Sequence, residues 1–187
     1  RIGLRYLELF VYYFGQNIAG YVKFGFYAQA GQCITLYHGE CLDQNGNFTQ
    51  ENFQAPEHRV EQCVKYICKE GWNEYKPEKS IFGFRYIKAI TDVKVTEKNF
   101  TAIAVYSDMP QTGKFECGHP GINQLFSNAV WSMKGNFLEI PTDCPTRERT
   151  GFTGDAQVFV NTGMYLMECY PVYRKFLSEL REVQLEG

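Results

Sequence analysis

The segment from residue 140 to residue 155 concentrates side chains that can do acid–base chemistry on a polar substrate. Its residues include three carboxylates and two arginines: Asp143, Glu148, Asp155, Arg147 and Arg149. No apolar period of 2.0 or 3.6 residues runs through the segment, so it is predicted to be an ordered loop. Long, charged loops that contain Pro and Gly often carry function, and a solvated polar connector is the alternative.

Cleavage of a glycosidic bond is one reaction that this composition suits. It needs a carboxylic acid that protonates the leaving oxygen and a carboxylate on the other side of the sugar, roughly 6.5–9.5 Å away in an inverting enzyme. Glu148 is the best candidate for the acid. Asp143 and Asp155 would raise its pKa and the arginines would lower it, and the sequence leaves that balance open.

Other residues of the loop suit sugar binding. Asp143 and Asp155 could accept hydrogen bonds from sugar hydroxyls, because ionised carboxylates are strong acceptors. Phe152 could lie against the apolar face of a sugar ring, and a buried loop anchor is the alternative for this side chain.

Cys144 offers a second chemistry, that of a thiol nucleophile whose pKa the nearby arginines would lower. A cysteine nucleophile normally needs a histidine base, and the loop contains none. We therefore expect Cys144 to pack beneath the loop, as buried free cysteines do. The chain has seven cysteines without a CxxC pair and three scattered histidines, so we expect no metal site and no cofactor.

The overall composition excludes several partners. The chain has 19 basic and 21 acidic residues, a formal net charge of -2, which gives no general attraction to nucleic acid or to an anionic membrane. No apolar run reaches the roughly 18 residues that a membrane-spanning helix needs. The odd number and the spacing of the cysteines favour reduced thiols and a cytoplasmic location. A secreted or periplasmic protein is the alternative, because the sequence begins with Arg1 rather than Met.

The first part of the chain is predicted to be all β. Short segments rich in aromatic and β-branched residues, separated by turn signals, are predicted strands: 8–14, 21–27, 34–38, 64–68, 82–87 and 100–106. Residues 47–61 and 69–80 are predicted loops. Short strands without helical periodicity predict an antiparallel β-sandwich.

From about residue 110 the apolar period becomes that of helices. Residues 114–117 are predicted to be a last strand, after which Pro120 suits the first turn of a helix. A buried face of that helix is predicted from apolar residues three and four positions apart: Ile122, Leu125, Phe126, Ala129, Val130 and Met133.

Two further helices are predicted after the loop. Asp155 is a good N-cap for a helix at 156–169, and Pro171 opens the other. Their predicted apolar faces are Val158, Phe159, Thr162 and Tyr165, and Val172, Phe176, Leu180 and Val183. We therefore expect a β-sandwich domain at 1–110 and a helical domain at 111–187. The helical domain is expected to be truncated, because such helices need partner helices to bury their apolar faces.

Six motifs occur in a fixed order between about residue 10 and the end of the chain: Phe14–Gly20, His38–Asp43, Gly83–Tyr86, Ser107–Cys117, Gly135–Phe137 and Pro141–Asp155. Together they resemble the motifs of bacterial α-L-rhamnosidases of glycoside hydrolase family 78. The resemblance implies an antiparallel β-sandwich of the jelly-roll or concanavalin-like type, followed by the first helices of an (α/α)6 barrel. It also implies hydrolysis of terminal α-L-rhamnosides with inversion.

The same resemblance implies roles for residues of the loop. Glu148 is the expected general acid. Asp143, Arg147 and Asp155 are the expected ligands of the rhamnose hydroxyls, and Phe152 is the expected aromatic wall, where many members carry Trp. The general base of the family is a glutamate far downstream, so we expect the 187-residue chain alone to hydrolyse nothing. A rhamnoside is the expected binding partner. The sequence leaves open whether the protein forms a homodimer.

Two other functions stay open. The 16% aromatic content and Trp72 would also suit a carbohydrate-binding β-sandwich with a non-catalytic helical extension. The better explanation of the aromatic residues is that they fill the core of the sandwich. The second alternative is an (α/α)6 glycosidase with a different sugar specificity.

Overall fold

The computed structural model describes residues 7–54 and 61–184 of the chain. The contacts divide the chain into two compact units, Arg1–Ala104 and Val105–Gly187. Among the described residues, no helix combines the length and the apolar character needed to cross a membrane.

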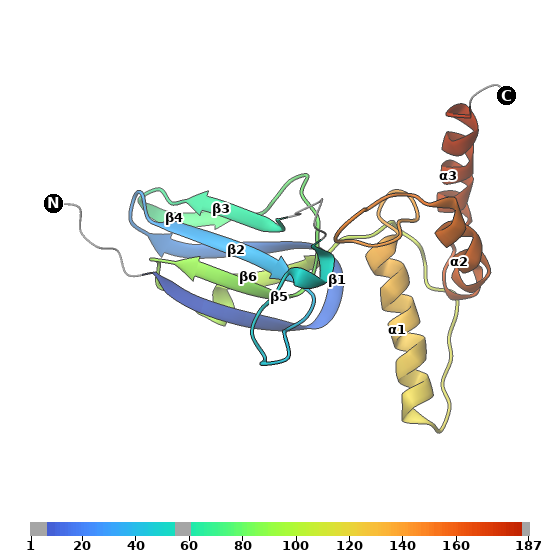
Figure 1. The fold of residues 1–187 in the computed structure, drawn as a ribbon, viewed down its shortest axis with the longest axis horizontal. Helices are drawn as coiled ribbons and strands as arrows, with labels where there is room; N and C mark the ends of the chain where they lie inside the picture. The colour runs from blue at the N-terminus through green and yellow to red at the C-terminus, as the bar shows by residue number, and fades with distance from the viewer. Residues whose placement is uncertain (1–6, 55–60, 185–187) are drawn as a thin grey trace. The chain divides into compact units, whose positions relative to one another are not determined.

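The first unit is one six-stranded antiparallel sheet (Figure 1). Its strands are β1 Glu8–Ala28, β2 Cys33–Gly39, β3 Cys63–Ile67, β4 Gly71–Tyr75, β5 Phe82–Thr91 and β6 Phe100–Ala104. They lie in the order β3-β2-β5-β1-β4, and β6 also pairs with β1. The predicted sandwich therefore takes the form of a single curled sheet.

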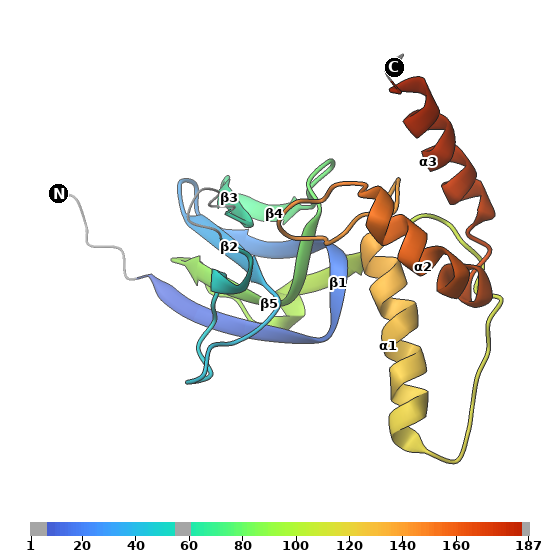
Figure 2. The same cartoon turned by 45° about the vertical axis from the view of Figure 1, so that its right-hand side comes forward.

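Strand β1 organises this sheet because it pairs with three partners along its 21 residues. Residues 8–20 pair with β5, 20–24 with β6 and 24–28 with β4. The register with β5 shifts between Tyr13 and Ile18, where Gly15 has a φ of 83°. Such a bulge bends a strand, and Figure 2 shows the ribbon of β1 turning back at this end of the sheet.

Gly20 lies where β1 passes from one partner to the next, in register with Phe82 of β5 and Ala104 of β6. A Cβ atom at this position would lie 1.9 Å from the carbonyl oxygen of Ile103. The atoms that such a Cβ atom would meet belong to the backbone of β6, which cannot move aside as a flexible side chain can. The pairing of β1 with β6 therefore requires glycine here.

The core of the sheet is aromatic and aliphatic. Phe24, Phe84, Ile34, Leu36 and Ile87 are fully buried. The ring of Phe24 is stacked on that of Phe26, with the centroids 5.2 Å apart. The buried aromatic residues of the strands thus have the packing role that the sequence predicts.

A polar cluster lies within this apolar core. The side chain of Gln62 forms two hydrogen bonds with the backbone of Gly83, at 2.9 and 3.0 Å. The ring of His38 stacks on Phe82, 4.2 Å between centroids, and its Nδ1 lies 3.4 Å from the carbonyl oxygen of Gln62. Burial lowers the pKa of His38 to about 4.

Three predictions for this part of the chain were wrong. The predicted strands 8–14 and 21–27 are one strand, because the turn residues between them form a bulge inside β1. The predicted loop at 69–80 contains β4, which Asn73 stabilises through side-chain bonds to the backbone of Lys69 and Gly71. The predicted loop at 47–61 contains a short 3-10 helix at Glu51–Phe53, and residues 55–60 lie outside the described residues.

The second unit contains helices α1 Pro120–Asn136, α2 Thr153–Leu166 and α3 Tyr170–Glu182. The core that joins them is formed by buried residues of all three helices, of the turns that follow α1 and α2, and of the segment before α1: Met109, Val130, Met133, Phe137, Ala156, Leu166, Met167, Cys169, Tyr173 and Phe176. The ring of Phe137 contacts both Phe159 and Tyr173, at 6.0 and 5.7 Å between centroids. The predicted order of an antiparallel β domain followed by helices is confirmed.

Details of the helical predictions were wrong. Residues 114–117 form no strand, because the side chain of Asn123 binds both the N–H and the carbonyl of Cys117. Helix α2 begins at Thr153 with Phe152 as its N-cap, so Asp155 lies in the first turn.

The predicted apolar faces of the helices are only partly buried. In α2, Val158 and Tyr165 are 83% and 82% exposed, whereas Ala156, Gly163 and Leu166 are buried. A Cβ atom at Gly163 would lie 3.4 Å from Met133 and 3.5 Å from Cys169, so this glycine faces the core of the helical unit. In α1, Ile122 and Leu125 are exposed, and Val183 after α3 is exposed as well.

The close approach at Gly20 yields a stability prediction. We expect Gly20→Ala to destabilise the sheet by about 2 to 3 kcal/mol, because β1 and β6 must separate to admit the methyl group. Urea denaturation of the chain, followed by Trp72 fluorescence in a Trp131→Phe background, measures this change. Gly118→Ala is the control, since nothing lies within 4 Å of a Cβ atom there. Equal midpoints for the two variants would contradict the assignment.

The burial of His38 yields a pH prediction. In the unfolded chain the imidazole titrates near 6.5 and binds a proton that the folded state, with a pKa of about 4, does not bind. Stability is therefore complete above pH 6.5 and falls as the pH drops toward 4. We expect a loss of about 2 kcal/mol between pH 7 and 5 in the same denaturation assay. The His38→Gln variant should lack this slope, and a slope that persists in the variant would assign it to other groups.

Candidate functional site

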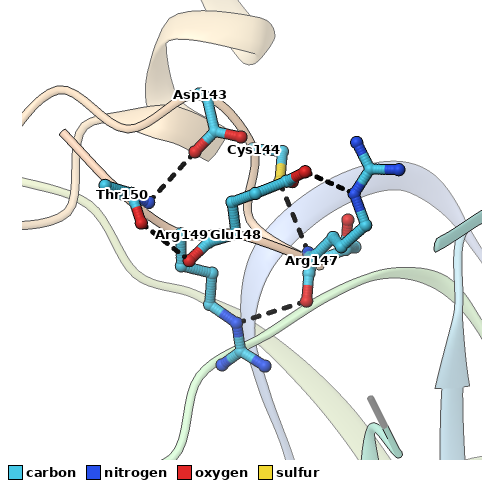
Figure 3. A network of polar contacts seen from close by, with 7 residues as sticks. Asp143, Cys144, Arg147, Glu148, Arg149 and Thr150 are labelled. Carbon is cyan, nitrogen blue, oxygen red and sulfur yellow. Dashed lines mark hydrogen bonds and ion pairs between the residues drawn. The ribbon is translucent and has the colours of Figure 1, made fainter. Parts of the chain in front are cut away.

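Two backbone closures hold the loop between α1 and α2. At its start, the N–H and the hydroxyl of Thr142 both donate to the carbonyl of Asn136, at 2.8 and 3.0 Å. Further on, the N–H of Asp143 donates to the carbonyl of Thr150 at 3.1 Å, and the N–H of Thr150 donates to Oδ1 of Asp143 at 3.0 Å. This second pair of bonds closes residues 144–149 into a compact turn (Figure 3).

Inside the turn, Glu148 is held by two neighbours. The thiol of Cys144 donates to Oε2 of Glu148 at 3.2 Å, and Nε of Arg147 donates to Oε1 at 2.6 Å. The Sγ atom of Cys144 also accepts the backbone N–H of Arg147 at 3.3 Å. Both carboxylate oxygens of Glu148 are therefore hydrogen-bonded within the turn, and Figure 3 shows the bond to Arg147.

The backbone reverses at Arg149. Its φ of 52° is uncommon for a residue other than glycine. The Nε atom of Arg149 donates to the carbonyl of Thr146 at 3.3 Å, and the hydroxyl of Thr150 donates to the carbonyl of Glu148 at 3.1 Å. Because the segment is not extended, Arg147 lies beside Glu148, whereas the side chain of Arg149 points the other way (Figure 3).

The turn brings two of the three predicted carboxylates together. An oxygen of Asp143, the sulfur of Cys144 and an oxygen of Glu148 lie within 4.8 Å of one another. Within this group, Cys144 and Glu148 share a hydrogen bond. The juxtaposition puts a candidate proton donor beside a candidate acceptor for sugar hydroxyls.

A cavity of about 440 Å³ lies between the helices and contains the third carboxylate. Asp143 and Asp155 both line it, together with Ser132, Asn136, Phe159 and Tyr173 among others. Asp155 belongs to the first turn of α2, where the helix dipole favours a negative charge. The lining does not include Glu148, Arg147 or Phe152.

Phe152 is 47% exposed at the N-cap of α2, where its carbonyl accepts the N–H of Ala156 at 3.1 Å. The alternative of a buried loop anchor is therefore wrong for its side chain. An exposed ring next to the turn remains available for stacking on a ligand.

The sequence leaves open whether the neighbours of Glu148 raise or lower its pKa, and the structure gives the direction. Its pKa lies below the ordinary range, first because of the hydrogen bond from Cys144 and then because of its own backbone N–H and of Arg147. Desolvation acts in the opposite direction and loses, since about a third of the side chain, 34%, is exposed. A general acid needs a raised pKa to carry its proton near neutral pH. The contacts of Glu148 in the described residues therefore favour its ionised form.

Comparison with known proteins agrees with this architecture. Residues 5–106 match the family described as the bacterial α-L-rhamnosidase concanavalin-like domain. Residues 110–187 match the bacterial α-L-rhamnosidase 6 hairpin glycosidase domain. The two matched domains are those of a glycoside hydrolase, in the order predicted from the sequence.

Individual relatives support the same assignment. The chain is 34% identical to an α-L-rhamnosidase of Formosa agariphila over 177 residues, which are 92% of this chain and 19% of that protein. It is 35% identical to one of Streptomyces avermitilis over 180 residues, 94% of this chain and 17% of that protein. It thus spans less than a fifth of the length of these relatives.

Among solved structures, the Streptomyces avermitilis α-L-rhamnosidase complexed with L-rhamnose is similar to this chain with a TM-score of 0.88 and 34% identity. The similarity covers 95% of this chain and 17% of that one. With both domains matched, the chain belongs to the bacterial α-L-rhamnosidase family.

Two kinds of residue at the site escaped the sequence analysis. Cys144 was predicted to pack beneath the loop, but it is half-buried and binds Glu148 and Arg147, because the turn folds its thiol toward them. Ser132 and Asn136 line the cavity from the last turns of α1. Their polar side chains beside the buried Val130 and Met133 were the available signal.

The closure between Asp143 and Thr150 yields a prediction about the rigidity of the turn. We expect Asp143→Ala to speed hydrogen exchange at the amide of Thr150 by about tenfold, because the bond to a charged acceptor is lost. Hydrogen exchange measured by NMR reads this directly. The matched control is Asp143→Asn, which keeps a carbonyl acceptor and should retain most of the protection. Exchange in the alanine variant as slow as in the unmodified chain would show that the side chain does not close the turn.

Proposed function

We propose that the whole protein hydrolyses terminal α-L-rhamnosides with inversion, and that Glu148 is its general acid. The observation that supports this role is the turn at 144–149, which holds the Glu148 carboxyl within 4.8 Å of a carboxylate oxygen of Asp143 in a segment matched by the glycosidase domain. Rhamnose as the sugar is supported by the relatives, of which the Streptomyces avermitilis enzyme has been solved with L-rhamnose.

In this proposal the protonated Glu148 donates its proton to the departing glycosidic oxygen. A carboxylate on the opposite face of the ring activates a water, at a separation from Glu148 of roughly 6.5–9.5 Å. That general base belongs to a part of the protein outside these 187 residues. The water attacks the anomeric carbon as the bond to the leaving oxygen breaks, which inverts the configuration.

The sugar is held by the residues around the turn. Asp143 and Asp155 accept hydrogen bonds from rhamnose hydroxyls, since both carboxylates line the same cavity. Arg147 donates to the sugar from the guanidinium that now binds Glu148 through Nε. The exposed ring of Phe152 covers an apolar face of the sugar.

Substrate binding has to change the protonation of Glu148. Desolvation already acts to raise its pKa, although the bonds from Cys144 and Arg147 outweigh it. A bound sugar would exclude water from the carboxyl and give Arg147 a competing acceptor. Both effects raise the pKa toward the value that a general acid needs.

A carbohydrate-binding function of the sheet is the second candidate. The rings of Tyr27 and Trp72 contact each other at 5.1 Å between centroids and are 75% and 47% exposed. Exposed aromatic pairs suit stacking on sugar rings. This function would give Glu148 no role, so the experiment below separates the two.

We expect Glu148→Gln in the full-length protein to lower kcat/KM for a chromogenic α-L-rhamnoside by about 100- to 10,000-fold, because the proton donor is lost. Glu139→Gln is the control: it makes the same chemical change in the same loop, at a side chain that is 82% exposed. The 187-residue chain alone should show no hydrolysis. Full activity of the Glu148 variant would exclude this residue as the acid.

A further inference from the structure

The side chain of Cys144 contacts two other residues of the turn that contains Glu148. Its Sγ atom lies 3.2 Å from Oε2 of Glu148 and 3.3 Å from the backbone nitrogen of Arg147. One small side chain therefore contacts both the carboxyl of the proposed acid and the backbone of the residue before it. The preceding residue, Asp143, closes the turn by its hydrogen bonds with Thr150, and these bonds also fix the backbone next to Cys144.

The surroundings of Cys144 are polar, which distinguishes it from a packing cysteine. Cys169 shows the packing kind: it is completely buried in the core of the helical unit. Cys144 is half-buried and does not belong to that core. Its contacts are hydrogen bonds with atoms of the turn, so filling apolar space does not account for a thiol at this position.

A thiol is suited to hold a carboxyl that changes its protonation state. Sulfur is a weak hydrogen-bond donor through S–H and a weak acceptor through its lone pairs. Toward the ionised Glu148, Cys144 donates, as the structure has it. Toward the protonated Glu148, the S–H can rotate away and the sulfur can accept the O–H, with no proton passing to the sulfur.

We propose that Cys144 is a positioning residue for Glu148. Its thiol holds the carboxyl in place in both protonation states, as a hydrogen-bond donor to the ionised form and as an acceptor from the protonated form. The proposal rests on the proposed function of Glu148 as general acid. Catalysis by a positioned acid depends on its geometry before and after proton transfer, and loss of a fixed position is costly.

The groups that face the Glu148 carboxyl in the described residues are Cys144, Arg147 and Asp143. Arg147 contacts Oε1, whereas Cys144 contacts Oε2, so the two bonds are independent in space. Removal of the thiol deletes its bond to Glu148 and its contact with the backbone N–H of Arg147, and it leaves the charged side chains of Arg147 and Asp143 in the chain. A change in the titration of Glu148 after this removal reports the loss of these two thiol contacts.

The first test is the titration of the Glu148 side-chain carboxyl in this chain, followed by carbon NMR with the signal assigned by its absence in Glu148→Gln. We expect Cys144→Ala to raise the midpoint by roughly half a pH unit, since the carboxylate loses a donor. Cys144→Ser keeps a donor and should leave the midpoint low. The control is Cys117→Ala, another half-buried thiol, which should change nothing. A midpoint in Cys144→Ala equal to that of the unmodified chain would overturn the proposal.

The second test uses rhamnoside hydrolysis by the full-length protein. We expect Cys144→Ala to lower kcat about tenfold, with little change in KM, and to move the basic limb of the kcat/KM profile upward by the titration shift. Cys144→Ser should recover most of kcat. Unchanged kcat and an unchanged basic limb in Cys144→Ala would overturn the positioning role. Absence of hydrolysis by the unmodified protein would instead refute the proposed function, and the titration would still decide the contact of Cys144 with Glu148.

Discussion

The pair of hydrogen bonds between Asp143 and Thr150 is the constraint on which the candidate site depends. Without it, the charged residues 144–149 would sample many conformations, because a polar loop has little apolar surface to bury. With it, the backbone must reverse within six residues, and this brings Arg149 to a φ of 52°. The reversal turns Arg147 and Cys144 toward the same carboxyl. A side chain proposed to bind sugar is thus also the side chain that shapes the turn.

The sheet and the helical unit are stabilised by different kinds of packing. In the sheet, one long strand makes the connections, and the absence of a Cβ atom at Gly20 permits its change of partner. In the helical unit, apolar side chains of all three helices form the core, and a Cβ atom at Gly163 would make only ordinary contacts there, 3.4 Å from Met133 and 3.5 Å from Cys169. Apolar residues such as Val158 lie exposed on the outer face of α2. The close approach at a glycine is therefore a constraint of the sheet.

Much of this could be predicted from the sequence, and the failures have physical causes. Periodicity located the helices that begin at Pro120 and near Pro171, because proline marks a first turn. It misjudged which residues of α2 are buried, since Val158 and Tyr165 are exposed whereas Ala156, Gly163 and Leu166 are buried. It also split β1 in two, because a glycine turn and a β-bulge have the same local composition. The contact of Cys144 with Glu148 depends on the backbone reversal, which no local pattern encodes.

The hydrogen bonds that position Glu148 conflict with the chemistry proposed for it. Each bond donated to a carboxylate stabilises the ionised form, and so the contacts of Cys144 and Arg147 oppose the protonation that a general acid requires. A donor that could not also accept would make this conflict permanent. A thiol is the weaker donor and can accept from the protonated acid, whereas the guanidinium can only donate and must find another acceptor. The composition of the turn therefore assigns different tasks to its two donors. Cys144 can stay with Glu148 through the reaction, and Arg147 is the donor that has to exchange its partner for the sugar.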